Sequence, residues 1–470
     1  MGLRTTITAK KKLTAVTKWL GAAMIVVLGA ASVKPVARAQ TPNESAAPDA
    51  SGAPAASGPI RMPITGGQAE FPIAVSALKN LGGDDGGQTS NAFDTVLTRD
   101  LKLSSYFHLI DPASFIENAQ SSGFDVGQIN FNDWKSIGAE FLVKGAVTRN
   151  GGSVEVEALL FDVAGQRRLM GKKFNGSPHD VGEMARRFAD AVMLAVTGTP
   201  GPFDSKIAFV STGGGRFKEI YTAWMDGGSL FKVTDNPTIN LFPSLDRGAR
   251  HLLYLSYKSM TPELYLVDLG QQTETRIDPG LGQAVGGTLT PGGNIVAAYQ
   301  RNGNTNLYLV DSTGGELNAI TNNQAINVSP SVCADGTKLA FTSDRSGTPQ
   351  IYVGTVNGGS AQRITYNGSY NTAPAFSPDC KKIAYESREG GIFQIYVIDA
   401  GGGDPRELTQ SGSNESPAWS PDGRYIIYGS RSGGGSRIYL MRAEDGNVIG
   451  PLMEGEGNDS DPSWSGWMGE

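Results

Sequence analysis

Short apolar runs separated by glycine-rich turns recur along the C-terminal two-thirds of the chain, from about Lys206 onward. Each unit holds four such runs, which in the fifth unit lie at 374–377, 382–385, 394–399 and 406–409. An apolar residue in the last run recurs every 43 or 44 positions, at Val233, Ile277, Ile320, Ile364, Leu408 and Leu452. A period in the low to mid forties with four strands per unit is typical of β-propeller blades.

The two ends of this repeat complement each other. Five units are complete between Pro243 and Leu452, whereas 206–234 offers only three strands. The missing opening strand, of the form Pro-x-Trp/Phe-Ser, stands at the other end of the repeat as 462–465. Pairing it beside 207–211 would complete one blade and leave no free strand edge at the seam. The sequence therefore predicts a mainly β fold, with a six-bladed β-propeller over 206–466.

The preceding region, 60–198, predicts a smaller α+β domain. Its first strand is 71–75, and helical and extended patterns then alternate up to 174. Its last element is a helix that Ser177 caps and Pro178 opens, with one apolar stripe that ends before Gly198. The proline- and glycine-rich stretch 199–205 predicts a hinge to the propeller.

The first 39 residues predict an export signal. They carry seven basic and no acidic side chains, and an apolar run at 19–33 ends in a small-x-small site, Ala37 to Ala39. Cleavage before Gln40 would release an exported mature protein. The alternative is an uncleaved anchor, against which Lys34 and Pro35 interrupt the run before membrane-spanning length. Residues 40–59, almost all small, polar or proline, predict a flexible linker.

Charge and composition exclude some classes of partner. Removal of 1–39 leaves 33 basic and 46 acidic residues, a net charge near −13, which disfavours nucleic-acid binding. No later segment is apolar enough for membrane insertion. The two cysteines, Cys333 and Cys380, fall near the same face of neighbouring blades and could form a disulfide or remain free thiols. A metal site is disfavoured, since none of the three histidines is near a cysteine in sequence.

Two rings of polar residues make the loops after the second and fourth strands the candidate site. The first, the amide ring, precedes each innermost strand and has acidic neighbours at Glu415 and Asp459; its members are Asn240, Gln283, Asn327, Asn371, Asn414 and Asn458. The second, the basic ring, comprises Arg216, Lys258, Arg301, Arg345, Arg388 and Arg431. Both predict a polar docking surface for a partner around the channel mouth. The alternative is structural, with the amides bonding loop backbone and the basic residues pairing with neighbouring blades.

Signals for catalysis are absent from the sequence. No G-x-S-x-G motif occurs, and His251 is the only histidine of the propeller. We therefore expect no catalytic residue, cofactor or metal. A lyase-like propeller enzyme and a small-ligand sensor remain the alternatives to a protein-binding adaptor.

The export signal, the α+β domain that opens with 71–75, and repeats of the form Pro417 to Gly423 together resemble the TolB family. That family is the periplasmic component of the Tol-Pal system of Gram-negative bacteria. The resemblance covers about 60–464 and implies an adaptor for outer-membrane integrity and constriction during cell division. It implies that the mouth binds the peptidoglycan-associated lipoprotein Pal, and that TolA is contacted through Ile60, Arg61, Ile64 and Thr65. The long linker and the irregular third blade, which reads Thr290-Pro291-Gly292-Gly293, depart from the family pattern.

Overall fold

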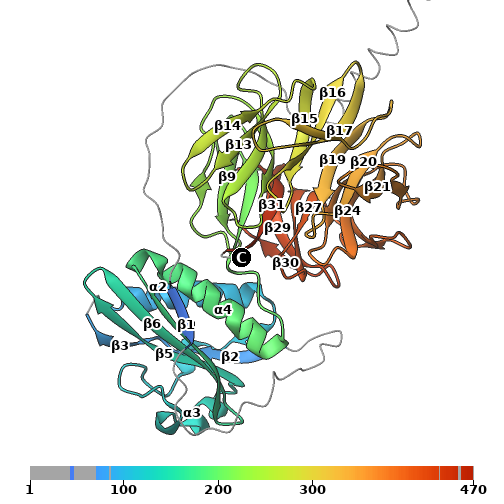
Figure 1. Ribbon diagram of the computed structural model, residues 1–470. Coiled ribbons are helices and arrows are strands. Elements are labelled where there is room, and N and C mark those ends of the chain that lie inside the picture. The colour runs from blue at the N-terminus through green and yellow to red at the C-terminus, as the bar shows by residue number, and fades with distance from the viewer. Residues whose placement is uncertain (1–42, 47–69, 84–85, 433, 454–456, 469–470) are drawn as a thin grey trace, which may run out of the picture. The chain divides into compact units, whose positions relative to one another are not determined.

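The computed structural model describes residues 43–46, 70–83, 86–432, 434–453 and 457–468 (Figure 1). The chain divides into two compact units between Asp204 and Ser205. Within the described ranges, none of the helices combines the length and the apolar character needed to cross a membrane.

The first unit contains a mixed sheet in the order β1-β7-β6-β5-β2-β4, with β3 paired to β5. Strand β2 runs parallel to β4 and β5, whereas β5, β6 and β7 form an antiparallel meander. The helices α2 and α4 pack on each other through the rings of Phe93 and Phe188, 6.0 Å apart. The elements are β1 (Asn43–Ala46), β2 (Phe71–Val75), β3 (Lys79–Gly82), α2 (Gln88–Leu103), β4 (Phe107–Leu109), α3 (Phe131–Ser136), β5 (Phe141–Asn150), β6 (Ser153–Asp162), β7 (Arg167–Gly176) and α4 (Val181–Thr197), with short 3-10 turns at Pro112–Ser114, Val126–Gln128 and Pro178–Asp180.

The last helix of this unit begins and ends as the sequence predicts. Ser177 and Asp180 form a reciprocal capping box ahead of α4, and Gly198 ends the helix in the left-handed conformation. The buried carboxylate of Asp190 then accepts hydrogen bonds from the backbone N–H groups of Phe203 and Asp204, at 2.8 and 3.0 Å. The segment that leads to the second unit is therefore bonded to α4 up to its last residue.

The second unit is a propeller of six four-stranded antiparallel sheets, which confirms the predicted fold class (Figure 1). Its strands follow, blade by blade: blade 1, β31 (Asp459–Trp467), β8 (Ser205–Ser211), β9 (Glu219–Trp224), β10 (Phe231–Lys232); blade 2, β11 (Asn240–Leu245), β12 (His251–Ser256), β13 (Glu263–Asp268), β14 (Thr273–Ile277); blade 3, β15 (Gln283–Leu289), β16 (Ile295–Arg301), β17 (Asn304–Val310), β18 (Glu316–Ala319); blade 4, β19 (Asn327–Val332), β20 (Lys338–Ser343), β21 (Gln350–Thr355), β22 (Gln362–Arg363); blade 5, β23 (Asn371–Phe376), β24 (Lys382–Glu389), β25 (Ile392–Asp399), β26 (Arg406–Glu407); blade 6, β27 (Ser413–Trp419), β28 (Tyr425–Ser432), β29 (Gly435–Arg442), β30 (Val448–Pro451).

The C-terminal strand closes the ring as predicted. Strand β31 pairs antiparallel with β8, with Ser463 opposite Ala208 and Trp464 opposite Ile207. The indole of Trp464 donates a hydrogen bond to the Ser205 hydroxyl at 2.8 Å. The two ends of the repeat thus share one blade, so neither leaves an unpaired edge.

The hydrophobic core of the propeller lies mainly between successive blades, where apolar residues of adjoining sheets form shared clusters. The disulfide Cys333–Cys380 joins blades 4 and 5 across one of these junctions, with a Cα–Cα separation of 5.5 Å. It settles the alternative that the sequence left open in favour of the bridge.

The prediction of an unstructured linker over 40–59 is wrong for residues 43–46, which form β1 against β7. Composition could not show this pairing, because the ladder needs only backbone N–H and C=O groups and β7 offers them at the edge of its sheet. The predicted signal at 1–39 and the remaining linker residues lie outside the described residues.

Candidate functional site

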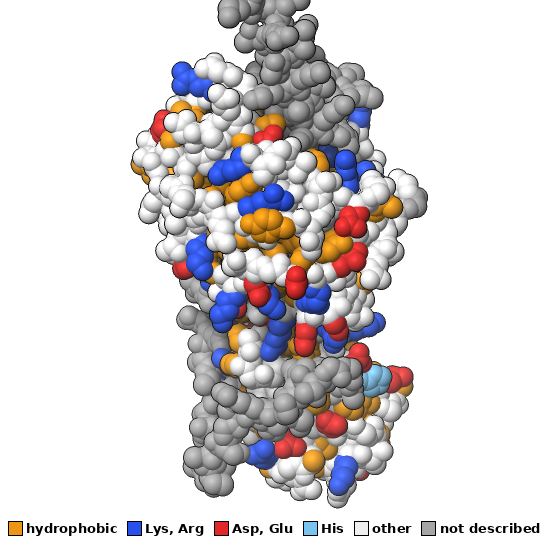
Figure 2. All heavy atoms as spheres, turned by 90° about the vertical axis from the view of Figure 1, so that its right-hand side faces the viewer, with side chains coloured by type: hydrophobic (Ala, Val, Ile, Leu, Met, Phe, Trp, Pro, Cys, Tyr) orange, Lys and Arg blue, Asp and Glu red, His pale blue; other side chains and the backbone are white. Residues whose placement is uncertain are grey.

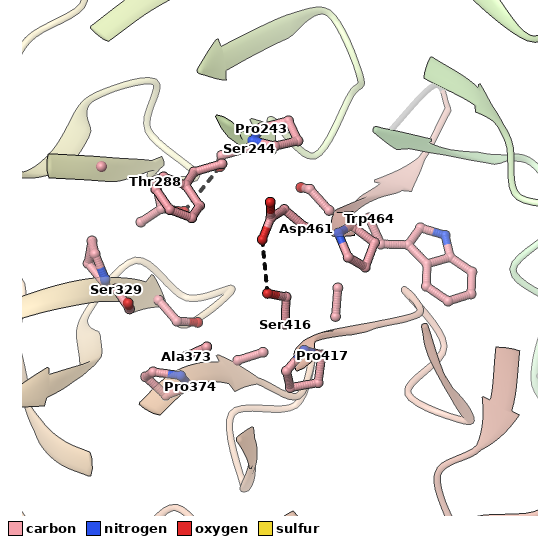
Figure 3. Close-up of a pocket in the computed structure, with 18 of the residues that line it drawn as sticks. Pro243, Ser244, Thr288, Ser329, Ala373, Pro374, Ser416, Pro417, Asp461 and Trp464 are labelled. Atoms are coloured by element: carbon pink, nitrogen blue, oxygen red, sulfur yellow. Dashed lines mark hydrogen bonds between the residues drawn. The ribbon is translucent and has the colours of Figure 1, made fainter. Parts of the chain in front are cut away.

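The innermost strands of the six blades surround a central cavity of about 670 Å³. It is lined by the first strand of each blade, with a proline in five of the six: Pro243, Pro330, Pro374, Pro417 and Pro462. Figure 3 shows the labelled side chains arranged around the opening from several different blades. We call the face that carries the loops after the second and fourth strands the mouth of this channel.

The residue before each of these prolines has a left-handed backbone. These residues are Phe242, Ser329, Ala373, Ser416 and Asp461, with φ between 50° and 54°. In every case the ladder to the second strand shifts register at this point, so each innermost strand carries a β-bulge. A left-handed non-glycine residue costs about 1–2 kcal/mol. Repetition of this strain around one cavity is typical of a functional site.

The bulges place polar side chains in the channel. The Ser416 hydroxyl donates a hydrogen bond to the Asp461 carboxylate at 3.1 Å, and the two side chains point toward each other in Figure 3. Ser244 and Thr288 lie 3.2 Å apart across another junction of blades. These contacts bridge neighbouring blades, so the channel wall is continuous across them.

One of the residues that line the cavity is a buried acid. The carboxylate of Glu386, on β24, accepts a hydrogen bond from the backbone N–H of Ser416 at 2.8 Å and is 9% exposed. Burial, and then the nearby carboxylates of Glu415 and Asp461, raise the pKa of Glu386 to about 8. At neutral pH Glu386 is therefore mostly protonated and carries little charge.

Four of the six residues of the amide ring are buried, so their side chains are not accessible to a docking partner. Asn240, Asn327, Asn371 and Asn414 are each at most 1% exposed. They stand at the start of the innermost strands, where the side chain turns toward the preceding blade. The structural alternative considered for these residues is confirmed.

Each buried amide bonds a polar side chain of the preceding blade. The Nδ2 group of Asn371 donates to Gln350 Oε1 at 2.8 Å, and Asn414 donates to Gln394 at the same distance. Asn240 bonds Glu219 at 2.9 Å, and Asn327 bonds Asn306 at 3.3 Å. These hydrogen bonds, with those from the same Nδ2 groups to loop carbonyls, hold successive blades together.

Two blades depart from this pattern. In blade 1 the structural equivalent is Asp459, which faces Ser211 as Asn371 faces Ser387, so the choice of Asn458 was wrong by one residue. Asp459 is buried and interacts electrostatically with Arg437 of blade 6, whereas Asn458 is exposed. In blade 3 the equivalent Gln283 is exposed, and Glu263 of the preceding blade pairs instead with Arg276 at 2.7 Å.

The basic ring is exposed at all six positions, but its members differ in their partners. Lys258 pairs with Glu274, and Arg345 donates to the Asn327 amide oxygen at 2.9 Å. Arg388 and Arg431 line the cavity together with Glu415, whereas Arg216 and Arg301 do not. The members of the basic ring that line the cavity are therefore those of blades 5 and 6.

The sequence reasoning missed an aromatic pair on this side of the mouth. Tyr370 and Phe393 lie edge to face with ring centroids 5.9 Å apart, and both line the cavity. It also missed the left-handed residues and Glu386. A signal for the left-handed residues was available, because each stands directly before the proline that repeats three residues after the amide position.

The remaining residues singled out in the sequence lie either outside the described residues or away from the cavity. The predicted contacts at Ile60, Arg61, Ile64 and Thr65 lie outside the described residues. His251 does not line the cavity and is bonded to Asp246 through Nδ1 at 2.9 Å. Cys333, Asp335 and Cys380 have spacing suited to a metal, but the disulfide occupies both sulfur atoms.

Figure 2 shows basic and acidic side chains interspersed on one face of the molecule, with hydrophobic side chains exposed among them. This face carries no extended field of one sign, unlike the basic surfaces that bind nucleic acid.

Comparison with protein families matches residues 194–468 to the TolB beta propeller domain and 61–169 to the TolB amino-terminal domain. The crystal structure of TolB from Acinetobacter baumannii superposes with a TM-score of 0.72 at 28% sequence identity. That match covers 85% of this chain and 97% of the other.

Curated relatives match over shorter segments. A Tol-Pal system protein TolB from Desulfosudis oleivorans is 39% identical over 254 residues, which is 54% of this chain and 58% of the relative. Another, from Anaeromyxobacter dehalogenans, is 33% identical over 282 residues, 58% of this chain and 63% of the relative. The chain thus spans less than two thirds of the length of these two relatives.

Proposed function

This chain belongs to the TolB family, and from that premise we propose that it is a non-enzymatic, protein-binding component of the Tol-Pal system in the periplasm. The proposal extends to outer-membrane integrity and constriction during cell division. Two matches to family models, in the order of the two domains, support it. The predicted export signal supports the location.

The observation that carries a binding role is the channel mouth. Backbone strain, buried carboxyl groups and exposed arginines gather around one cavity of about 670 Å³. We propose that this mouth binds the peptidoglycan-associated lipoprotein Pal. We propose that the partner contacts Glu415, Arg388, Arg431 and the side chains of the five residues that have a left-handed backbone. Arg301 and Arg345 would make contacts farther out, on the rim of the mouth. The four buried amides are not part of the contact.

TolA forms the second proposed contact, through the segment that contains Ile60, Arg61, Ile64 and Thr65. Support for this contact comes from the family resemblance of the segment between the signal and the first domain. A peptide of residues 40–66 should bind TolA on its own, and removal of 60–65 from the protein should abolish TolA binding while lipoprotein binding persists. Equal TolA binding by the truncated protein would overturn this assignment.

The test of the central proposal is capture from envelope extract of the source cells with the immobilised mature protein. We expect the lipoprotein Pal among the captured proteins, identified by mass spectrometry. Ala373→Glu, which puts a charged side chain into the channel, should abolish the capture. Thermal unfolding should show the variant folded, and Thr273→Glu, on the exposed outermost strand of blade 2, is the matched control. Failure to capture the lipoprotein, or turnover of oligouronides with divalent metal, would contradict the proposal.

A further inference from the structure

Of the members of the basic ring that lie over aromatic rings, only Arg388 lines the cavity; the others are Arg216, Lys258 and Arg345. The guanidinium carbon of Arg388 lies 4.8 Å from the ring centre of Tyr370 and 5.9 Å from that of Phe393. Phe393 faces Arg388 directly across the β24–β25 ladder, and the Arg388 backbone N–H donates to the Tyr370 carbonyl at 2.9 Å. The ladder and this hydrogen bond therefore fix the backbones that carry all three side chains.

The charge of Arg388 is not matched by a partner. Among the described residues, no acidic side chain lies within ion-pair distance of Arg388 or of Arg431, the next basic residue around the mouth. Other basic residues of the propeller are paired, as Lys258 is with Glu274 and Arg276 with Glu263. Two exposed guanidinium groups with free hydrogen-bond donors at the edge of a cavity suit a carboxylate.

An acid close to Arg388 on β24 carries little charge at neutral pH. Glu386 lies two residues before Arg388 on β24, and its raised pKa leaves it mostly protonated there. The charged groups that face Glu386 are Glu415 from β27 and Asp461 from β31, and Tyr370 lies close enough to sense both Glu386 and Arg388.

We propose that the protein partner docks on this part of the mouth, placing a carboxylate on the Arg388 guanidinium and an adjacent apolar side chain on the rings of Tyr370 and Phe393. Arg431 adds a second donor for the same acidic segment. An arginine stacked on aromatic rings is already restricted before binding and therefore loses little further freedom on binding, and stacked arginines and aromatic residues are the usual anchors of interfaces. This inference rests on the proposed function, since it names the chemistry by which that partner is recognised.

The primary test is titration calorimetry of the mature protein with the purified lipoprotein Pal at pH 7. Arg388→Gln should weaken binding at least tenfold, and Arg388→Lys, which keeps the charge but loses the planar fork, should recover part of the loss. Arg216→Gln is the matched control, because Arg216 is exposed in the same ring but neither lines the cavity nor belongs to the proposed contact. Binding by Arg388→Gln equal to that of the wild-type protein would overturn the inference and leave the proposed function intact.

A second probe is independent of that partner. N-acetyl-L-phenylalanine carries a carboxylate beside an aromatic ring, and N-acetyl-L-phenylalaninamide lacks the charge. In ligand-observed NMR at millimolar concentration, we expect the acid to bind the wild-type protein, the amide not to bind, and Arg388→Gln to remove the signal. If the lipoprotein does not bind but the acid does so through Arg388, the proposed function is wrong. The assignment of Arg388 and its aromatic neighbours as a carboxylate-binding site is then still supported. If the lipoprotein and the acid both fail to bind, both proposals are overturned.

Discussion

The residue Cys380 combines a favourable disulfide with an unfavourable backbone, so its replacements should separate the two effects. It occupies the fourth position of a Ser-Pro-Asp-x turn, where blade 6 has Gly423, and both residues have positive φ, at 60° and 71°. Both turns close through the same hydrogen bond, from Cys380 N to Ser377 O at 2.9 Å and from Gly423 N to Ser420 O at 3.0 Å. The cysteine is therefore held where glycine is favoured.

The two contributions have different sizes. A bridge between residues 47 apart removes chain entropy from the unfolded state that is worth about 4 kcal/mol. The left-handed backbone costs a non-glycine residue about 1 kcal/mol. We expect Cys380→Ala to lower the free energy of unfolding by about 4 kcal/mol, because it loses the bridge and keeps the strain. Cys380→Gly should lose only about 3 kcal/mol, because glycine relieves the strain.

Urea unfolding of the propeller, followed by tryptophan fluorescence under oxidising conditions, measures this difference. Cys333→Ser is the matched control, since blades 5 and 6 have serine at the equivalent place, and it should resemble Cys380→Ala. Under reducing conditions Cys380→Gly should become more stable than the wild-type protein. Equal midpoints for the alanine and glycine variants would refute the strain argument, and wild-type stability in all three variants would refute the bridge.

Three further predictions concern the ring and its channel. Asn371→Ala should cost about 1–3 kcal/mol of unfolding free energy, because it leaves the buried Gln350 oxygen short of a donor, whereas Asn458→Ala should be nearly neutral; equal urea midpoints would refute this assignment. Deletion of 457–470 should remove β31 and broaden or abolish the cooperative melting transition of the propeller, and an unchanged melting curve would contradict closure by this strand. The pKa of Glu386 is raised to about 8 in the folded protein, so its contribution to stability is present at low pH and lost as the pH rises through 8. The loss begins above pH 4.5, the ordinary pKa of a glutamate, and is complete a little above pH 8. Glu386→Gln should therefore flatten the fall in melting temperature between about pH 5 and 8, and an identical fall in both proteins would argue against a buried acid.

The candidate site shows where sequence reasoning reached its limit. The loop order placed six basic residues on one face of the propeller, and all six are exposed. It misassigned the amides, because alternation along a strand does not say whether a polar side chain at the strand start turns to solvent or to the next blade. For Asn371, the sequence is equally consistent with an exposed and with a buried side chain. The structure decides between them, because the side chain donates a hydrogen bond to Gln350, 21 residues earlier in the chain.

The sequence by itself determined the number of blades and the seam that closes them. These follow from a periodic pattern and from one strand missing at one end and present at the other, which are local facts about the chain. Only the tertiary structure decided that Cys333 and Cys380 are bridged, that Glu386 lies buried beside two acids, and that Arg388 rests on Tyr370 and Phe393. Each of these depends on distances between side chains of different strands or blades. Such distances are set by how the sheets pack, and no periodicity in the chain records them.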